Sequence, residues 1–307
     1  MTINSQIVVF DAADLAATCE GRSMNAPPRR DVLKIGALLA VPAARHAGVV
    51  RFGASRDAWP AFHHAIPYAS GTRIYCNRVN QIPVPWPSPH AAALVSIRPW
   101  PPDLLAGRLD QRLRHMARKA PPGSMLTPWY EAGPSNPRGY DKAITATAVQ
   151  HCQRYLRHFL RHTNIAVGSL IAGPAADLTE WIAPGLDWYG DDIDGEWFRQ
   201  GGQWRTSYFQ RRQARNHAEW QRKARTRHPQ VVVGETNIHD DQLRPEWFTM
   251  LAASMAARGG GRIFTFWAEP GRARQGHGTG PWPPSARTIM TLRNLAAYYG
   301  HHGLKLW

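Results

Sequence analysis

The chain has 307 residues, of which 43% are apolar or aromatic, and its formal net charge is +15. This length and apolar content suit one sizeable core, and an α/β barrel commonly forms a single domain of this size. The basic residues are scattered except between 205 and 228, where helix-forming residues separate them. The charge therefore predicts a solvated helix face and gives no specific indication of nucleic-acid binding, although an anionic polymer of a cell envelope would also suit this surface.

Residues 1–47 are predicted to be an N-terminal extension that ends in an export signal. Arg29 and Arg30 precede an apolar run over 35–44, and small residues lie near the end of that run. A twin arginine before an apolar run of about ten residues is typical of a Tat-type signal peptide. The run is too short for a membrane anchor, which needs roughly 20 residues.

The signal begins unusually late in the chain. Met24 lies just upstream of the twin arginine and would give an n-region of ordinary length. We therefore expect translation to begin at Met24, and cleavage after Ala43 or Ala47. Tat substrates cross the membrane folded, so the mature part, 48–307, is expected to work as a secreted or cell-envelope protein without a membrane span.

Eight short apolar runs in the mature part are predicted to be strands: 49–54, 72–76, 93–97, 124–128, 166–171, 186–189, 230–234 and 262–266. The clearest helical patterns between them are 104–119, 142–162, 204–227 and 246–258. Continuous apolar strands that alternate with helices indicate a parallel sheet buried on both faces. Eight repeats predict an α/β protein with a (β/α)8 TIM barrel in a single domain. The alternative, an open doubly wound sheet, usually has a Gly-rich phosphate turn after the first strand, and 53–56 does not supply one.

In such a barrel the functional residues lie where strands end and enter the following loops. These ends are rich in polar and aromatic residues, and many of the 13 Trp and nine Tyr follow apolar runs. An aromatic ring can stack on the apolar face of a pyranose, so the pattern favours a carbohydrate substrate. The residues predicted to bind it are Arg98, Trp100, Trp129, Tyr130, Tyr189, Asp192, Asp194, Asn237 and Trp267.

Glu131 and Glu235 follow the fourth and seventh predicted strands, which face each other across an eight-stranded barrel. Hydrolysis of a glycosidic bond uses one carboxylic acid to protonate the leaving oxygen and a second carboxylate as nucleophile or base. Either Glu alone could be a loop carboxylate paired with Arg, but the two together favour catalysis. Reserve candidates are Glu269, Asp57, Asp192 and Asp194.

Several short fragments, in this order, resemble the clan A glycoside hydrolases, and most of all family 26 and related secreted actinobacterial barrels. The fragments are 73–75 (RIY), 126–131 (LTPWYE), 186–192 (LDWYGDD), 234–236 (GET) and 264–267 (FTFW). The resemblance covers most of 49–270. It implies a retaining glycosidase with Glu131 as acid/base, Glu235 as nucleophile and Trp267 as a sugar platform.

Two positions depart from the family pattern. Tyr130 stands where the family has His, or Asn in other members of the clan, before the acid/base. Asp194 stands where the family has a Tyr after strand 6, although Tyr189 is close in sequence. A second acid near Glu235 would disfavour its ionised form. The departures leave open a weak or inactive barrel that binds cell-envelope carbohydrate.

Other motifs give little support for metal or cofactor chemistry. His158 and His162 have a helical spacing that can bind metal, but flanking arginines favour a solvated face. The aspartates 191, 192 and 194 could hold a divalent ion, line the sugar site or pair with Arg. Cys76 and Cys152 are expected to be buried thiols, with a disulfide as the alternative. We expect no metal, no cofactor, no nucleic-acid partner and a monomer. The third hypothesis is a basic protein that binds an anionic polymer or nucleic acid electrostatically.

Overall fold

The computed structural model describes the following residues: 71–76, 79–82, 86, 92–129, 144–172, 179–226, 229–234, 236, 238, 240–259, 261 and 284–300. For 50–55 and 262–265 it describes the backbone alone. All of them belong to the unit His46–Trp307. The predicted signal, its start at Met24 and its cleavage site therefore lie outside the described residues.

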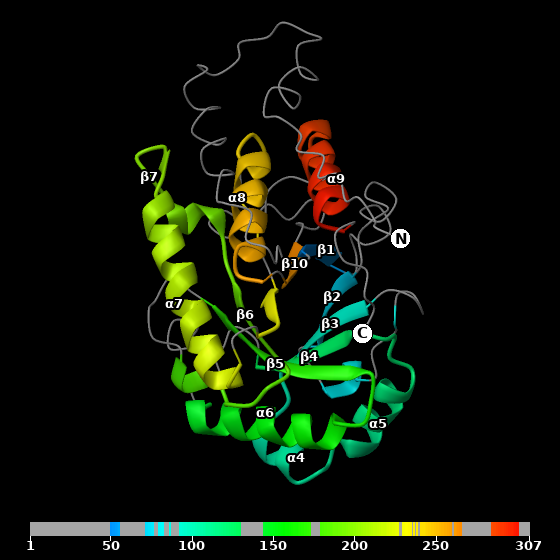
Figure 1. Ribbon diagram of the computed structural model, residues 1–307. Helices are drawn as coiled ribbons and strands as arrows, with labels where there is room; N and C mark the ends of the chain where they lie inside the picture. Colours follow the sequence, from blue (N-terminus) through cyan, green and yellow to red (C-terminus); the bar gives the residue numbers. More distant parts are fainter. Residues whose placement is uncertain are drawn as a thin grey trace, which may run out of the picture. The chain divides into compact units, whose positions relative to one another are not determined.

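Eight parallel strands hydrogen-bond in a closed ring, in the order β1-β10-β9-β6-β5-β4-β3-β2 (Figure 1). They are β1 Val50–Ser55, β2 Gly71–Cys76, β3 Ala92–Ile97, β4 Ser124–Pro128, β5 Ile165–Ala172, β6 Trp188–Asp192, β9 Val231–Val233 and β10 Gly261–Thr265. Each coincides with a predicted strand. The largest shift is at β6, which begins two residues late and includes two aspartates that were expected in the following loop.

Helices follow five of these strands within the described part of the chain: α4 Pro101–Leu105 and α5 Asp110–Arg118 after β3, α6 Ala146–Leu160 after β4, α7 Thr206–Ala224 after β6, α8 Arg244–Ala256 after β9 and α9 Ala286–Gly300 after β10. The predicted helix 104–119 is two helices, because Gly107 takes φ 73 between them. A curved parallel sheet of the α/β class is confirmed. The segments that follow β1, β2 and β5 lie largely outside the described residues, so the eightfold helix repeat is seen only in part.

Side chains alternate between the inside of the ring and the helix layer, as the two-residue period of a strand requires. Trp188 fills the inside and is fully buried. It fits because Gly168 lies beside it, where a Cβ atom would come within 2.1 Å of the indole ring. The buried residues of this inner cluster are Leu94, Met125, Leu170, Trp188 and Val232.

Two larger clusters fill the space between the ring and its helices. One joins α7, α8 and α9 to β5, β6 and β9, and the other joins α4, α5 and α6 to β2, β3, β4 and β5. The helices thus cover the ring from outside, as Figure 1 shows. We call the carboxyl end of the strands the mouth and the opposite end, where the helices finish, the base. The mouth is where an α/β barrel places its functional groups.

Candidate active site

A buried ion pair spans the inside of the ring. Arg73 on β2 and Asp192 at the end of β6 come from opposite sides of the ring. Arg73 Nη1 donates to Asp192 Oδ1 at 2.6 Å and Nη2 donates to Oδ2 at 3.2 Å. Both side chains are 5% exposed or less. This two-pronged geometry is the strong form of a charge-assisted hydrogen bond, and it neutralises Asp192 within the protein.

The guanidinium of Arg73 also lies over the ring of Tyr75, with Cζ 4.6 Å from the ring centroid. Tyr75 is two residues further along β2, so both side chains point into the ring. A cation over an aromatic face gains about 0.5–2 kcal/mol, more when the pair is desolvated. Arg73 is therefore held from two directions near the mouth.

Gly234, the residue after β9, lies directly against this ion pair. A Cβ atom at Gly234 would lie 2.6 Å from Asp192 Oδ1 and 2.7 Å from Arg73 Nη1. Its N–H donates to the carbonyl of Asp191 at 3.1 Å. The backbone therefore passes over the ion pair with no room for a side chain, one residue before Glu235.

Asp191 points the opposite way, into the helix layer. It is fully buried, accepts a hydrogen bond from Asn216 Nδ2 at 3.1 Å and lies 3.9 Å from Arg212 Nη2 on α7. Burial raises the pKa of Asp191, although Arg212 and Asn216 counteract it. Because adjacent strand residues face opposite sides, Asp191 and Asp192 cannot share one ion, and the option of a metal held by both is wrong.

Two buried hydroxyls lie on the inner face of neighbouring strands. Ser96 on β3 and Thr127 on β4 are register partners, and each is two residues beyond a member of the inner cluster. Both are fully buried, and their oxygens have no hydrogen-bond partner among the described residues. Buried hydroxyls without partners are costly, so they are candidates to bind a ligand group or a water. Nothing in the apolar runs distinguishes these two hydroxyls, although the two-residue period of a strand places them on the inner face.

Trp129 is a packing residue, and its predicted role in sugar binding is wrong. It is 4% exposed and packs with Ile144, Val149 and Trp181 outside the ring. Its φ of 54 is left-handed, an unfavourable conformation for a bulky side chain. That turn moves the Trp129 ring to the α6 side just before Tyr130.

Tyr189 is also placed away from the mouth, so its predicted substrate contact is wrong. It is fully buried in the outer cluster, and its hydroxyl accepts a hydrogen bond from the N–H of Leu186 at 2.9 Å. Burial raises the pKa of its phenol. Leu186 precedes β6, so the hydroxyl of Tyr189 is bound at the base.

Three other predicted residues lie at the mouth end of their strands. Trp100 follows β3 and is 44% exposed, while Arg98 is half-buried. Asp194 is half-buried at the start of the short helix η4, Gly195–Phe198, where its carbonyl accepts from Trp197 N at 3.3 Å. These positions are open to a ligand, in contrast to Trp129 and Tyr189.

The remaining predicted residues lie outside the described residues. They are the catalytic pair Glu131 and Glu235, the sugar contacts Tyr130, Asn237 and Trp267, and the reserve acids Asp57 and Glu269. Their roles stay predictions.

The indole ring of Trp247 contacts three segments at the mouth. Trp247 on α8 is fully buried and donates from Nε1 to Thr236 Oγ1 at 2.8 Å. Thr236 is the residue after Glu235. The Trp247 ring stacks on Phe198 of η4, with centroids 5.7 Å apart, and on Trp204, with centroids 5.9 Å apart. Trp204 belongs to a hairpin of β7 Arg199–Gln200 and β8 Gln203–Trp204. The loops after β6 and β9 therefore share one anchor.

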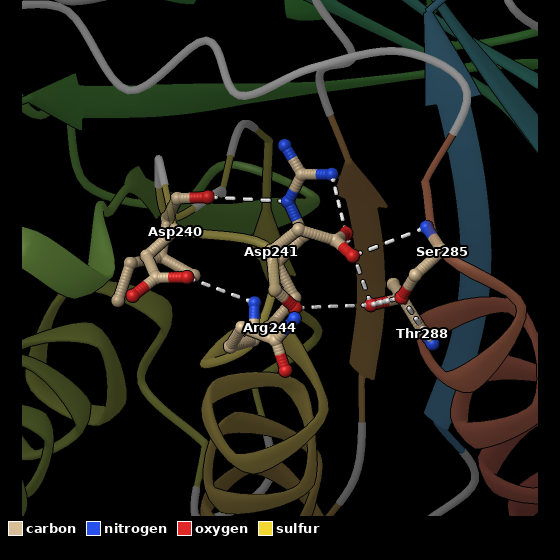
Figure 2. A network of polar contacts seen from close by, with 7 residues as sticks. Asp240, Asp241, Arg244, Ser285 and Thr288 are labelled. Atoms are coloured by element: carbon tan, nitrogen blue, oxygen red, sulfur yellow. Dashed lines mark hydrogen bonds and ion pairs between the residues drawn. The ribbon is translucent and has the colours of Figure 1, made fainter.

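A polar network fixes the rest of the loop after β9, as Figure 2 shows. The fully buried Arg244 donates to the carbonyl of Ile238 at 3.1 Å and to Asp241 Oδ1 at 2.8 Å. Asp241 also accepts from Ser285 N and from Thr288 Oγ1, both at 3.2 Å. Partial burial would raise the pKa of Asp241, but Ser285 and Arg244 outweigh it, and the pKa lies below its usual value. The network ties this loop to the start of α9.

The described residues contain no group of three or more His, Cys, Asp or Glu arranged to hold a metal ion. Cys76 and Cys152 are buried free thiols, as predicted, and burial raises the pKa of Cys152 to about 12. His158 and His162 are exposed on α6 and its end, as expected for a solvated face. Within the described part, no helix has the length and apolar character needed to cross a bilayer.

Comparisons with known proteins support the fold. No family model matches the chain, and no curated protein matches it. Among solved structures, the chain is similar to a GH26 beta-mannanase from Bacteroides ovatus, with TM-score 0.53, 12% identity and coverage of 89% of this chain and 94% of the other.

Two further structures are similar to a comparable extent. GH26C from Muricauda sp. has TM-score 0.51 and 9% identity over 88% of this chain and 90% of its own. A GH5-4 broad specificity endoglucanase from Clostridium longisporum has TM-score 0.56 and 10% identity over 86% and 98%. The predicted resemblance to clan A barrels is therefore confirmed at the level of fold.

Proposed function

We propose that the protein is an exported glycoside hydrolase that cleaves a polysaccharide or oligosaccharide with retention of configuration. The observation that carries this proposal is the Arg73–Asp192 pair across the ring, because it lies directly under Gly234 and so beside the strand end that leads into Glu235. Fixed charges buried at this end of the strands are suited to stabilising charge in a transition state.

In the proposed reaction Glu131 protonates the glycosidic oxygen while the carboxylate of Glu235 attacks the anomeric carbon. A water molecule, deprotonated by Glu131, then releases the sugar from Glu235. Such a pair stands about 5–5.5 Å apart in retaining enzymes. Asp192 would weaken the ionised form of Glu235 if its charge were free, but Arg73 compensates that charge.

The remaining mouth residues give the substrate its contacts in this proposal. The exposed ring of Trp100 would stack on a sugar, and the hydroxyls of Ser96 and Thr127 would hydrogen-bond to it or to a water beneath it. We propose a neutral β-linked substrate such as a mannan or a glucan, because similar structures are named as a mannanase and an endoglucanase.

The second candidate is a barrel that binds envelope carbohydrate without cleaving it. It is favoured by Tyr130, which stands where the clan A enzymes have His or Asn before the acid/base.

Hydrolysis of mannan and glucan by the wild type and by two variants, Glu131→Gln and Glu235→Gln, separates the candidates. The enzyme hypothesis predicts that reducing ends appear with the wild type and fall by about 10²–10⁴-fold in either variant. Glu246→Gln on α8 is the matched control and should retain activity. Binding of the glycan without any hydrolysis would favour the second candidate.

We also propose Tat-dependent export, on the basis of Arg29, Arg30 and the apolar run that follows. The mature protein would then fold before it crosses the membrane and act in the cell envelope or outside the cell, as a monomer.

A further inference from the structure

The base of the barrel carries basic side chains on four neighbouring segments. They are the end of α5 with the turn into β4, the end of α6 with the turn into β5, the turn into β6, and the end of α7. These segments lead into β4, β5, β6 and β9, which are consecutive in the ring. They therefore lie side by side at the end opposite the mouth.

Direct contacts join these segments into one surface. Asn164 Nδ2 donates to the carbonyl of Ala120 at 3.4 Å, which links the turns after α5 and α6. Arg157 Nε donates to Asp187 Oδ1 at 3.0 Å, and the N–H of Gly185 donates to the carbonyl of Lys223 at 2.9 Å. We call this the basal surface and define it as 118–123, 157–164, 182–187 and 219–226.

The negative charges of the basal surface are already engaged. Asp187 accepts from Arg157 and from the N–H of Val167 at 2.9 Å, and Glu219 is paired with Arg222 through both oxygens. No other acidic residue occurs in these four segments.

The positive charges are in excess and face solvent. Four of these side chains are exposed and have no ion pair within the described residues: Arg118, Lys119, Arg161 and Arg225. The macrodipole stabilises a cation at the C-terminus of a helix by about 0.3–1 kcal/mol, which accounts for one cation at each of these termini. It does not offset the repulsion among like charges that neighbouring helix ends bring together.

We propose that the basal surface binds an acidic polysaccharide, a polymer whose sugars carry carboxylates. Arg side chains pair with carboxylates in a two-pronged geometry. The exposed large apolar residues of the described chain are Trp100, Leu105, Met290 and Tyr298, and none belongs to the basal surface. It thus presents no exposed Trp, Tyr or Phe ring for stacking unpaired bases and no exposed apolar anchor for a bilayer.

This binding does not rest on the proposed hydrolysis. Because the basal surface and the mouth lie at opposite ends of the strands, a polyanion bound at the base would leave the mouth accessible. The protein would be retained on an acidic matrix while a second, neutral glycan enters the mouth.

Binding of the full mature chain to polygalacturonate tests the proposal with two triple variants of equal net charge. The basal variant is R118Q/R161Q/R225Q, and the control is R211Q/R215Q/R287Q, which removes exposed arginines of α7 and α9 that have no ion pair among the described residues. We expect wild-type affinity to fall with salt, a loss of about tenfold or more in the basal variant, and a loss below about threefold in the control.

Unchanged unfolding midpoints verify that both variants are folded. Equal losses in the two variants would overturn the proposal, because binding would then follow net charge alone. No binding by the wild type at low salt would also overturn it. Tighter binding to duplex DNA or to phosphatidylglycerol vesicles than to polygalacturonate would assign the surface to another partner and reject the acidic polysaccharide.

Discussion

At the scale of single residues, the centre of the ring is defined by charge that the protein itself compensates. Removing one partner of a buried pair leaves an unpaired charge and typically costs about 3–5 kcal/mol, although the intact pair adds little net stability. The Arg73–Asp192 pair is therefore better explained by the geometry it imposes than by stability. The pair lies directly against Gly234 at the end of β9 and leaves no space there for a side chain.

Gly234→Ala is expected to destabilise the protein by about 1–3 kcal/mol, because the new methyl group would overlap both Asp192 and Arg73. Glycan hydrolysis should be lost as well, since the strain falls next to Glu235. Gly185→Ala is the control: its φ of 72 strains an alanine, but nothing lies within 4 Å of the added Cβ. An equal loss of glycan hydrolysis in both variants would contradict this account.

Asp241→Asn is expected to lower the free energy of unfolding at neutral pH by about 2 kcal/mol, because it removes the charge that faces the buried Arg244. The pKa of Asp241 is depressed in the folded state, so its contribution is complete above its ordinary pKa of about 3.9 and disappears as pH falls through the lower, folded value.

The difference between wild type and Asp241→Asn should therefore shrink below about pH 4 in denaturant unfolding. Asp240→Asn is the matched control, since the side chain of Asp240 is exposed and accepts a hydrogen bond from the N–H of Gln242 in the same loop. A pH-independent difference, or a similar loss in the control, would argue against the assigned charge balance.

At the scale of elements, the loops after β6 and β9 are built as one unit. Trp247 stacks on Phe198 and Trp204 and donates to Thr236, so a helix outside the ring contacts the loop after β6 and the loop after β9. The conformation of these two loops at the mouth therefore depends on how α8 packs against them.

Trp247→Phe keeps an aromatic ring but removes the N–H donor, and the hydroxyl of Thr236 is left buried without it. We expect a loss of about 1–2 kcal/mol in stability and a fall in kcat with little change in KM. A double-mutant cycle with Thr236→Val isolates the bond, and its coupling energy should be about 1 kcal/mol. A coupling near zero would show that the bond does not hold the loop.

The sequence predicts the elements well and the directions of their side chains poorly. All eight strands are recovered because buried parallel strands are continuous apolar runs, but for the same reason these runs do not reveal which residues face inward. A shift of one residue exchanges the two faces. Asp191, Asp192 and Tyr189 illustrate this, since two acids expected in a loop lie in β6 and face opposite sides.

The prediction for Trp129 is wrong for a related reason, because an apolar pattern does not reveal a left-handed turn after β4. The Arg73–Asp192 pair and the hydroxyls of Ser96 and Thr127 depend on contacts between strands distant in sequence. Only the closed ring brings these residues together.

At the scale of the whole molecule, we propose that neutral glycan binds at the mouth, that an acidic polymer binds at the base, and that the protein is exported. If export uses the Tat route, replacing Arg29 and Arg30 by Lys should leave an uncleaved precursor inside the cell, because the twin arginine is the recognised feature. Fractionation and immunoblotting of the two forms measure this. Equal export of the variant would contradict the proposed route.

The central claim is that Glu235 forms a covalent bond to the substrate. Incubation with activated 2-deoxy-2-fluoro mannosides and glucosides, followed by mass spectrometry of the peptides, tests it most directly, because the fluorine slows release of the glycosyl-enzyme. The account predicts one added sugar on the peptide that contains Glu235 and none in Glu235→Gln. A label on another carboxylate, or an enzyme that turns over glycan and never becomes labelled, would contradict it.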